Sequence, residues 1–465
     1  MDSPPSPKLL VLEIVHLSPP PLEASPMAFP LSGLDTDRNV FDVTFRTVRL
    51  FPPHPPSIDP LAVLPRAFSA ALGLFLPLAG TLAAVDGDGG RGFVRSGADD
   101  DSVPLVLAAF DGMALADVDT DDPCSALLEL LAPADDGGSP VLALQATRFA
   151  CGGVALGMRV AHALCDGAGA TKFLSAAARF ARGETTPPVA VPPVVWERRE
   201  RLGPRNPPRM AKPFDRILAA ARHGPYSDQT CDEQPQVVRA CFHVSDARVE
   251  TLREKLSGEV GVKLTTFEIL AAFIWRARVK AKSTSPDEVV KMVYSMNISK
   301  LLSPPLPDGY WGNVCVPVYV TLAGGELITQ PLSHTATMIK NRKREIDDEY
   351  VRSYIDLHEL HRGDAGGGGV TAGRGVSAFT DWRRLGHSEV DFGWGPPDAV
   401  LPLSWRLLGS VEPCFFLPYG AGDGRRRRHG FKVFVAVTAE ALPRFREEMQ
   451  EILLQPQCYS SRQKL

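Results

Sequence analysis

A strand, a tight corner and a helix follow one another between residues 154 and 180, and this succession restricts the fold more than any other feature. Residues 154–160 are mostly aliphatic, as in a buried strand, whereas apolar residues recur at helical spacing in residues 171–180. His162, Asp166 and Gly167 lie at the corner between them. A polar side chain at such a corner can point into a cleft instead of being lost in the core.

The rest of the chain also mixes strands with helices, and no repeat of about 20 to 50 residues is present. Alternating or continuous apolar patterns predict strands at residues 8–15, 40–50, 237–244, 289–298, 314–322 and 431–437. Helical periodicity predicts helices at residues 61–76, 246–256, 265–282, 331–352 and 439–454. Ser245 and Thr265 are suitable N-caps for two of these helices. The predicted fold class is therefore α/β (α+β).

A chain of 465 residues is long enough for two domains, at about 100–200 residues per domain. Residues 183–235 are rich in proline and arginine, which is typical of a long crossover linker. We therefore predict an N-terminal domain over residues 1–182, which carries the His162 corner, a crossover linker over 183–235, and a C-terminal domain over 236–465.

Composition limits which binding partners and which cellular compartment are expected for this protein. The formal net charge of −4 gives no reason to expect nucleic-acid binding. The longest apolar run, residues 61–85, is interrupted by Pro65, Arg66 and Pro77, so no membrane span is expected. Eight cysteines are scattered without a Cys-x-x-Cys pair, which favours free thiols over disulfides or a zinc site. No secretory signal is visible, so we expect a cytoplasmic protein, with Gln463-Lys464-Leu465 only a weak peroxisomal address.

His162 is the best candidate for a general base. A neutral imidazole takes a proton from an attacking hydroxyl or amine, a contribution of roughly 10²–10⁴-fold in rate. Two roles are open for Asp166: it orients the ring of His162, or it folds away and fixes the corner through a basic partner. A His-x-x-x-Asp pair also arises by coincidence. The remaining histidines form no cluster with metal-ligand spacing, so no metal is expected.

A second motif, Asp391-Phe392-Gly393-Trp394-Gly395, follows more than two hundred residues later. Together, His162-x-x-x-Asp166-Gly167 and this motif resemble the plant BAHD acyltransferase family, which uses acyl-CoA donors. The resemblance covers nearly the whole chain. Further segments match in family order: residues 76–80, 265–270, 304–307 and 310–313. One departure is Asn297-Ile298-Ser299, where many members carry Asp-x-Arg.

The resemblance implies two chloramphenicol-acetyltransferase-like domains with an active-site channel between them. His162 would deprotonate the acceptor as it attacks the thioester carbonyl, without an acyl-enzyme. Acyl-CoA is then a co-substrate, and no permanently bound cofactor is expected. The resemblance also implies a monomer that acts on small molecules.

Further roles follow from the same resemblance. Thr380-Asp381-Trp382 matches a family motif at the reacting centre, so Thr380 and the Trp382 indole N–H are candidate oxyanion donors, although Trp382 serves equally well as a channel wall. The loop of Asp391, Gly393, Trp394 and Gly395 is predicted to be structural, with Asp391 paired to a basic residue. Thr265 and Thr266 either bind a CoA phosphate or simply cap their helix. The run Arg425–Arg428 either attracts CoA or forms a solvated loop.

The segments 382–390 and 410–418 resemble a branch that includes spermidine hydroxycinnamoyltransferases. A hydroxycinnamoyl donor and a polyamine acceptor such as spermidine are therefore predicted, giving a phenolamide. Asp356, Glu359 and Asp381 are candidates to hold the polyamine ammonium groups, although the first two can merely solvate their helix. The alternatives are an alcohol acceptor, acylated on oxygen, and a non-catalytic family member that binds a ligand.

Overall fold

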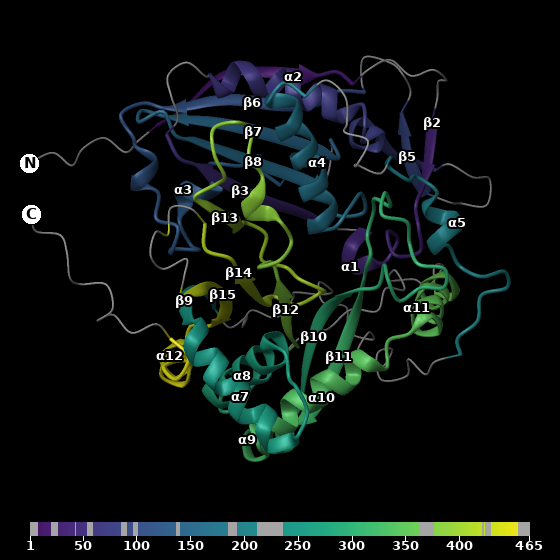
Figure 1. Ribbon diagram of the computed structural model, residues 1–465, viewed down its shortest axis with the longest axis vertical. Helices are drawn as coiled ribbons and strands as arrows, with labels where there is room; N and C mark the ends of the chain where they lie inside the picture. Colours follow the sequence, from purple (N-terminus) through teal and green to yellow (C-terminus); the bar gives the residue numbers. More distant parts are fainter. Residues whose placement is uncertain are drawn as a thin grey trace, which may run out of the picture.

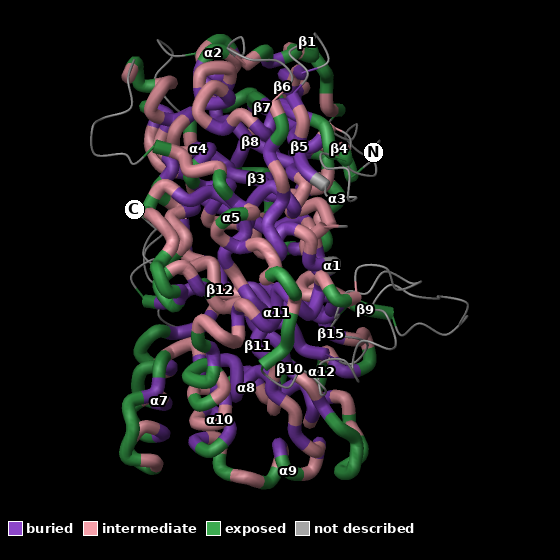
Figure 2. The backbone as a smooth tube through the Cα atoms, turned by 90° about the vertical axis from the view of Figure 1, so that its right-hand side faces the viewer, coloured by how far each residue is buried: buried purple, intermediate pink, exposed green. Residues whose placement is uncertain are grey.

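Two halves of the chain lie one beyond the other along the long axis of the molecule (Figures 1 and 2). In this computed structural model the described residues are 8–19, 27–41, 43–53, 59–84, 91–95, 101–135, 140–184, 193–211, 236–361, 376–420, 423 and 429–453. Within these residues, no helix has the length and apolar character needed to cross a membrane. The run Arg425–Arg428 and most of the predicted linker lie outside the described residues.

The first half is built on a six-stranded sheet, which we call the first sheet, in the order β1-β6-β7-β8-β3-β13 among the described strands. Their bounds are β1 Leu9–Leu17, β6 Val103–Phe110, β7 Leu142–Phe149, β8 Val154–Ala161, β3 Thr44–Phe51 and β13 Ala399–Pro402. Only the β6–β7 pair is parallel among these neighbours. Helices α2 (Pro60–Leu72) and α4 (Gly167–Ala181) pack together and share a core with this sheet.

The second half is built on another six-stranded sheet, the second sheet, in the order β11-β10-β12-β14-β15-β9 among the described strands. Their bounds are β11 Cys315–Ala323, β10 Val289–Asn297, β12 Val376–Asp381, β14 Glu412–Leu417, β15 Gly430–Thr438 and β9 Val237–Ser245. The strands β10, β12 and β14 run parallel to one another, and the outer pairs are antiparallel. Packed beside this sheet are α7 Asp246–Val260, α8 Thr266–Ala281, α10 Leu332–Arg344 and α12 Leu442–Met449.

Smaller elements complete the described chain. A three-stranded sheet has the order β2-β5-β4, with β2 Met27–Pro30, β5 Arg91–Arg95 and β4 Thr81–Ala84. The remaining described helices are α1 Arg38–Phe41, η1 Leu76–Ala79, η2 Leu115–Asp117, α3 Ala126–Glu129, α5 Arg198–Leu202, α9 Gly324–Thr329, α11 Asp348–Leu360 and η3 His387–Glu389. Mixed strands and helices confirm the predicted fold class.

One segment from the second half of the sequence lies within the first half of the structure. Strand β13 comes from the second half of the sequence but pairs with β3 at the edge of the first sheet. Just before it, Phe392 and Trp394 pack against Phe51, and Phe392 also contacts Phe68, inside the first-half core. The predicted division at residues 183–235 therefore fails for this segment, because apolar burial draws it into the first half.

Side-chain caps explain where several helices begin, including one helix start that the sequence prediction missed. The Asp166 carboxylate caps α4, and Thr265 with Glu268 forms a capping box on α8. The single helix predicted over residues 331–352 is two helices, α10 and α11. Asp347 adopts an extended conformation and accepts a hydrogen bond from the Tyr350 N–H, so a new helix begins there.

Candidate active site

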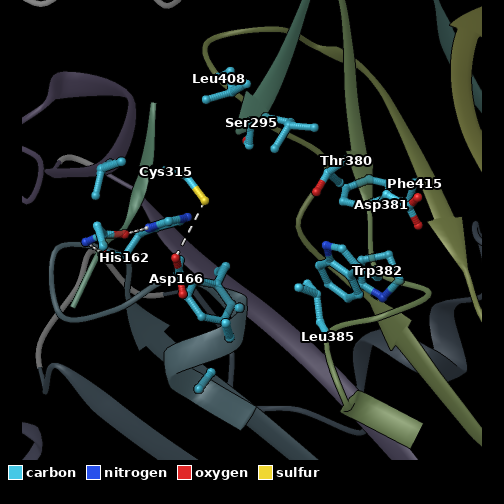
Figure 3. A pocket seen from close by; sticks show the side chains of 18 of the residues that line it. His162, Asp166, Ser295, Cys315, Thr380, Asp381, Trp382, Leu385, Leu408 and Phe415 are labelled. Carbon is cyan, nitrogen blue, oxygen red and sulfur yellow. Dashed lines mark hydrogen bonds between the residues drawn. The ribbon is translucent and has the colours of Figure 1, made fainter. Parts of the chain in front are cut away.

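A cavity of about 440 Å³ lies between the halves, and both contribute to its wall. Side chains of the first half include Phe45 and His162, and those of the second half include Thr380 and Trp382. Figure 3 shows His162 and Asp166 on one side of this pocket, with Thr380 and Trp382 across from them. The structure thus brings together four of the predicted site residues.

His162 directly follows β8, and its backbone N–H donates to the Val43 carbonyl at 2.8 Å. The ring of Phe45 packs edge-on against the imidazole, with ring centroids 5.1 Å apart. Strand β8 is buried along almost its whole length, so it forms a rigid support. The corner therefore holds the histidine at the pocket, as the sequence pattern predicts.

Asn313 fixes which nitrogen of His162 carries the proton. The Asn313 Nδ2 donates to the His162 carbonyl and to an Asp35 carboxylate oxygen, both at 2.8 Å. These two acceptors leave Asn313 Oδ1 facing His162 Nδ1 at 3.1 Å. Because a carbonyl oxygen only accepts, Nδ1 must carry the proton, and Nε2 keeps its lone pair. The imidazole is therefore held in the tautomer that a general base at Nε2 requires.

Asp35, which binds Asn313, is itself paired with Arg198. Their side chains form a fully buried ion pair with an N–O distance of 3.3 Å. Arg198 also donates to the Leu164 carbonyl at 2.8 Å, within the His162 corner, and its guanidinium lies over the Trp311 ring. A buried pair of this kind requires its partners, because an unpaired charge in the interior is strongly destabilising. The predicted linker, through Arg198, thus stabilises the corner that carries His162.

Asp166 is architectural. One carboxylate oxygen accepts from the Gly169 N–H at 3.0 Å and caps α4; the other accepts from the Val314 N–H at 3.3 Å and the Cys315 thiol at 3.7 Å. The alternative in which Asp166 orients His162 is wrong, since Asn313 makes that contact. The expected basic partner is also replaced, by backbone N–H groups and a thiol.

Burial and the Asp166 charge raise the pKa of the Cys315 thiol well above its usual value. The same two causes raise the pKa of Cys165. Because the thiolate is the nucleophilic form of cysteine, neither thiol is poised to form an acyl-enzyme.

Thr380 lies next to the last residue of β12, and Trp382 directly follows the strand. The Trp382 backbone N–H donates to the Phe416 carbonyl at 2.8 Å, and the indole packs against Phe415 and His387 at ring distances of 5.5 and 4.9 Å. This packing fixes the indole in the pocket wall. Donation to an oxyanion by Thr380 or Trp382 remains a prediction.

The Asp391 loop lies outside the wall of the main cavity. The Asp391 carboxylate accepts from the N–H groups of Gly393 and Gly395 at 2.8 and 2.9 Å. Both glycines have φ above +100°, a conformation that a side chain would strain. The predicted pairing of the Asp391 carboxylate with a basic residue is wrong, because Arg182 binds the Asp391 backbone carbonyl instead.

Thr265 has the capping role that the sequence left open. Its side chain accepts from the Glu268 N–H, while the Glu268 carboxylate accepts from the Thr265 N–H at 2.8 Å. Thr265 is exposed, Thr266 is half-buried, and neither lines the main cavity. Contact of Thr265 or Thr266 with CoA remains a prediction.

None of the three carboxylates predicted to bind a polyamine is both inside the main cavity and free of an ion pair with arginine. Asp356 is fully buried and accepts from Arg205 Nε at 2.6 Å and from the Arg209 N–H at 2.9 Å, so the prediction that it binds a ligand is wrong. Glu359 is half-buried on the same helix and does not line the main cavity. Asp381 lines the cavity, but Arg383 binds both of its oxygens, at 2.9 and 2.6 Å.

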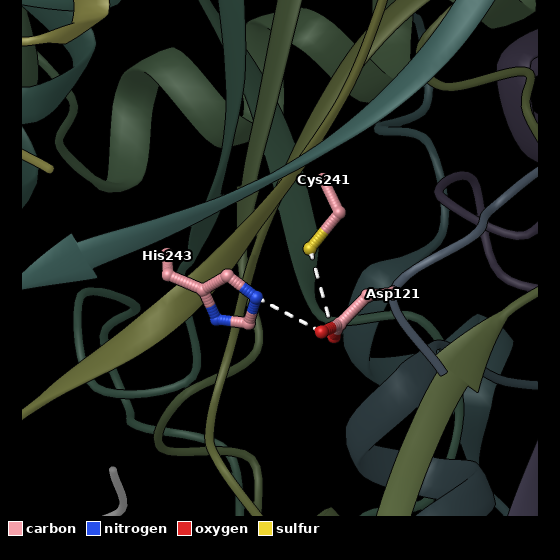
Figure 4. Close-up of side chains that lie close together, drawn as sticks. All are labelled: Asp121, Cys241 and His243. Atoms are coloured by element: carbon pink, nitrogen blue, oxygen red, sulfur yellow. Dashed lines mark hydrogen bonds and ion pairs between the residues drawn. The ribbon is translucent and has the colours of Figure 1, made fainter. Parts of the chain in front are cut away.

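A cluster of potential metal ligands joins the halves elsewhere (Figure 4). His243 Nε2 contacts the Asp121 carboxylate at 3.0 Å across 122 positions of sequence, and Cys241 lies beside them. Lys432 also pairs with Asp121, at 2.9 Å. Since an ammonium group already neutralises this carboxylate, we interpret the cluster as an ion-pair contact between the halves. Because Asp121 lies more than a hundred positions from Cys241 and His243, no local sequence pattern indicates this cluster.

Comparison with known proteins identifies the family. Residues 18–452 match the Transferase family, the family of BAHD acyltransferases. The chain belongs to the BAHD acyltransferase family. It is 30% identical over 462 residues to a spermidine coumaroyl-CoA acyltransferase of Arabidopsis thaliana, with 95% of each chain covered. It is also 30% identical over 322 residues to an omega-hydroxypalmitate O-feruloyl transferase of the same plant, covering 67% of this chain and 65% of the relative.

The fold is similar to that of vinorine synthase, with a TM-score of 0.70, 18% identity, and coverage of 96% of this chain and 98% of that one. This BAHD chain is therefore an acyltransferase that uses a CoA thioester as co-substrate, with the two-domain fold of its family.

Proposed function

We propose that this BAHD enzyme transfers an aromatic, hydroxycinnamoyl-type acyl group from CoA to a small acceptor, with His162 as the general base. The observation that carries the proposal is the Asn313 contact, which leaves Nε2 of His162 free in a pocket built from both halves. The coumaroyl-CoA and feruloyl relatives support the choice of acyl group.

The reaction needs a general base and hydrogen-bond donors that stabilise the negatively charged oxygen of the tetrahedral intermediate. His162 Nε2 takes the proton of the acceptor hydroxyl or amine as that group attacks the thioester carbonyl. The resulting oxyanion is stabilised by Thr380 and the Trp382 indole N–H, and it collapses to expel the CoA thiolate, which receives the proton from His162. The route uses these side chains and the thioester alone, without an acyl-enzyme.

The relatives support two acceptor classes. A spermidine relative suggests a polyamine, as the sequence analysis predicted. A specific observation favours the second class, an uncharged or anionic acceptor such as an alcohol: the Asp381 carboxylate is neutralised by Arg383, and Asp166 is held by backbone N–H groups and a thiol. Another cavity carboxylate, Asp37, accepts from the Tyr354 hydroxyl at 2.6 Å. A polycation would find these carboxylates already engaged.

We also propose that the enzyme works as a monomer in the cytosol. One chain supplies both sides of the pocket, so a second copy is not required to complete it. Gel filtration with light scattering of the purified protein tests the oligomeric state.

Release of CoA thiol from a panel of acyl-CoAs, measured against alcohols and polyamines, tests the proposed function. We expect turnover with hydroxycinnamoyl donors and a rate loss of roughly 10²–10⁴-fold in His162→Ala. His334→Ala, which removes an exposed histidine, is the matched control and should retain the wild-type rate. Turnover no greater than in buffer for every donor and acceptor would refute an enzymatic role. A loss of only a few-fold in His162→Ala would refute the assigned base.

A further inference from the structure

Arg49 is a buried cation without an acidic partner among the described residues. It lies on β3, its side chain is fully buried, and burial lowers its pKa to about 9, so it stays protonated at neutral pH. Its guanidinium donates to the Thr47 hydroxyl at 3.2 Å and contacts His387 Nδ1 at 3.2 Å, while its Nε has no hydrogen-bond partner.

Other buried arginines of the chain are better compensated. Arg198 pairs with Asp35, and Arg278 donates to the carbonyl groups of Glu412, Pro413 and Ala436. Arg49 has neither a carboxylate nor a carbonyl partner among the described residues. A buried positive charge with so little compensation attracts negative charge strongly, because water does not screen it.

The guanidinium sets the tautomer of His387. A guanidinium can only donate, so His387 Nδ1 must accept its hydrogen bond, and the ring proton must lie on Nε2. The Thr171 hydroxyl also contacts Nδ1, at 2.5 Å. Burial and the Arg49 charge lower the pKa of His387 well below its usual value, so the ring is neutral and keeps this tautomer.

The Nε2–H of His387 is thus a donor that no described group accepts from. His387 is 2% exposed, and its Nε2 has no hydrogen-bond partner. A Cβ atom at Gly167 would lie 3.5 Å from this nitrogen, so the glycine of the His-x-x-x-Asp-Gly motif leaves room beside it, although the nitrogen itself is buried. Gly167, Arg49 and His387 all line the same cavity as His162. This part of the cavity wall therefore contains a buried hydrogen-bond donor with a fixed positive charge on the other side of the ring.

We propose that the His387 Nε2–H, supported by Arg49, binds a carboxylate on the acceptor and so selects hydroxy acids or amino acids over neutral or cationic acceptors. The proposal rests on the proposed acyltransferase function. A carboxylate is the matching group because it accepts hydrogen bonds and carries the negative charge that Arg49 lacks. A polyamine ammonium would instead be repelled here.

Matched acceptors test this site. Wild-type enzyme is assayed with an aminobenzoate, a hydroxybenzoate, an aromatic hydroxy acid and a long-chain ω-hydroxy acid, each beside its methyl ester. We expect kcat/KM for at least one acid to exceed that of its ester by about ten-fold or more, as for a charge-assisted hydrogen bond. Equal rates, or faster acylation of every ester, would overturn the proposal.

Variants assign the effect to these side chains. In Arg49→Met and His387→Phe, KM for the acid should rise about ten-fold while KM for the ester stays within two-fold of wild type. His387→Gln keeps a donor and should retain part of the preference. Arg342→Met, on the surface of α10, is the matched control and should keep it in full. Equal losses on acid and ester in both cavity variants would mean a structural role and refute the assignment.

A binding measurement separates failure of this site from failure of the proposed function. The same acids and esters are added to wild-type protein without acyl-CoA, and Tm is recorded. An acid that raises Tm where its ester does not supports the carboxylate site even if no acyl-CoA is turned over. If acyl transfer proceeds but no acid stabilises the protein more than its ester, the carboxylate site is refuted and the acyltransferase function stands.

Discussion

Replacing Asn313 with alanine removes the acceptor that holds the Nδ1–H of His162, and we expect kcat to fall about ten-fold. The Nδ1–Oδ1 contact of 3.1 Å joins two neutral groups before reaction, and such a hydrogen bond contributes about 1 kcal/mol. In the transition state the ring becomes positively charged, and the same bond is then worth about 1.5–3 kcal/mol. The difference, about 0.5–2 kcal/mol, acts only on the chemical step and corresponds to roughly 2- to 30-fold, with ten-fold near its middle.

The assay is thiol release at saturating acyl-CoA, with kcat and the acceptor KM measured separately. KM should change little, because Asn313 acts on the base and not on the substrate. Asn341→Ala removes an exposed asparagine from α10 and serves as the control for the substitution itself. Urea unfolding shows whether the variant is folded under assay conditions.

A double variant separates action through His162 from general damage. In a His162→Ala background, Asn313→Ala should change the residual rate by less than about two-fold, because there is no imidazole left to hold. If Asn313→Ala lowers the rate equally in both backgrounds, or leaves kcat unchanged in the wild-type background, the assigned role of Asn313 is refuted.

Three further predictions concern the support of the site. Arg198→Met should lower the free energy of unfolding by about 3 kcal/mol in urea, since it leaves the Asp35 carboxylate buried without its ion-pair partner; a loss below about 1 kcal/mol would contradict this. Asp391→Ala should cost about 2 kcal/mol by leaving two N–H groups without an acceptor, and loss of activity with normal stability and CoA affinity would count against a structural loop. His243 and Lys432 hold the pKa of Asp121 well below its usual value of 3.8, so this carboxylate stabilises the fold above about pH 4, and that stabilisation is lost as the pH falls through the folded pKa. Asp121→Asn should therefore lower Tm at pH 7 by more than at low pH, and an equal effect at both would refute the linkage.

The corner around His162 could be predicted because its determinants are local. An apolar strand, a capping aspartate and a helical repeat all lie within residues 154–181, and the structure places β8, the Asp166 cap and α4 there. The caps of α7 and α8 are equally local, with Ser245 and Thr265 as their N-caps. In each case the side chain bonds to a backbone group three positions away, which a sequence displays directly.

Contacts between distant segments could not be predicted in the same way. Asn313 belongs to a recognised motif, but its bond to His162 spans 151 positions. The helical spacing of Asp356 and Glu359 predicts ligand-binding carboxylates, but it carries no information about Arg205, which lies 151 positions from Asp356 and binds it. Strand β13 has only four residues, so it shows no alternating pattern, and its place in the first sheet depends on pairing with β3.

Because of these distant contacts, the position of His162, the proposed base, depends on how the two halves are assembled. His162 is tied to the first half through the Val43 carbonyl and to the second half through Asn313, whose position depends on Asp35. A general base must stay within hydrogen-bond reach of the proton it abstracts, so small displacements along this series of contacts act on kcat. Asp121 joins the same halves at a place that does not line the cavity, and its loss therefore acts on stability instead.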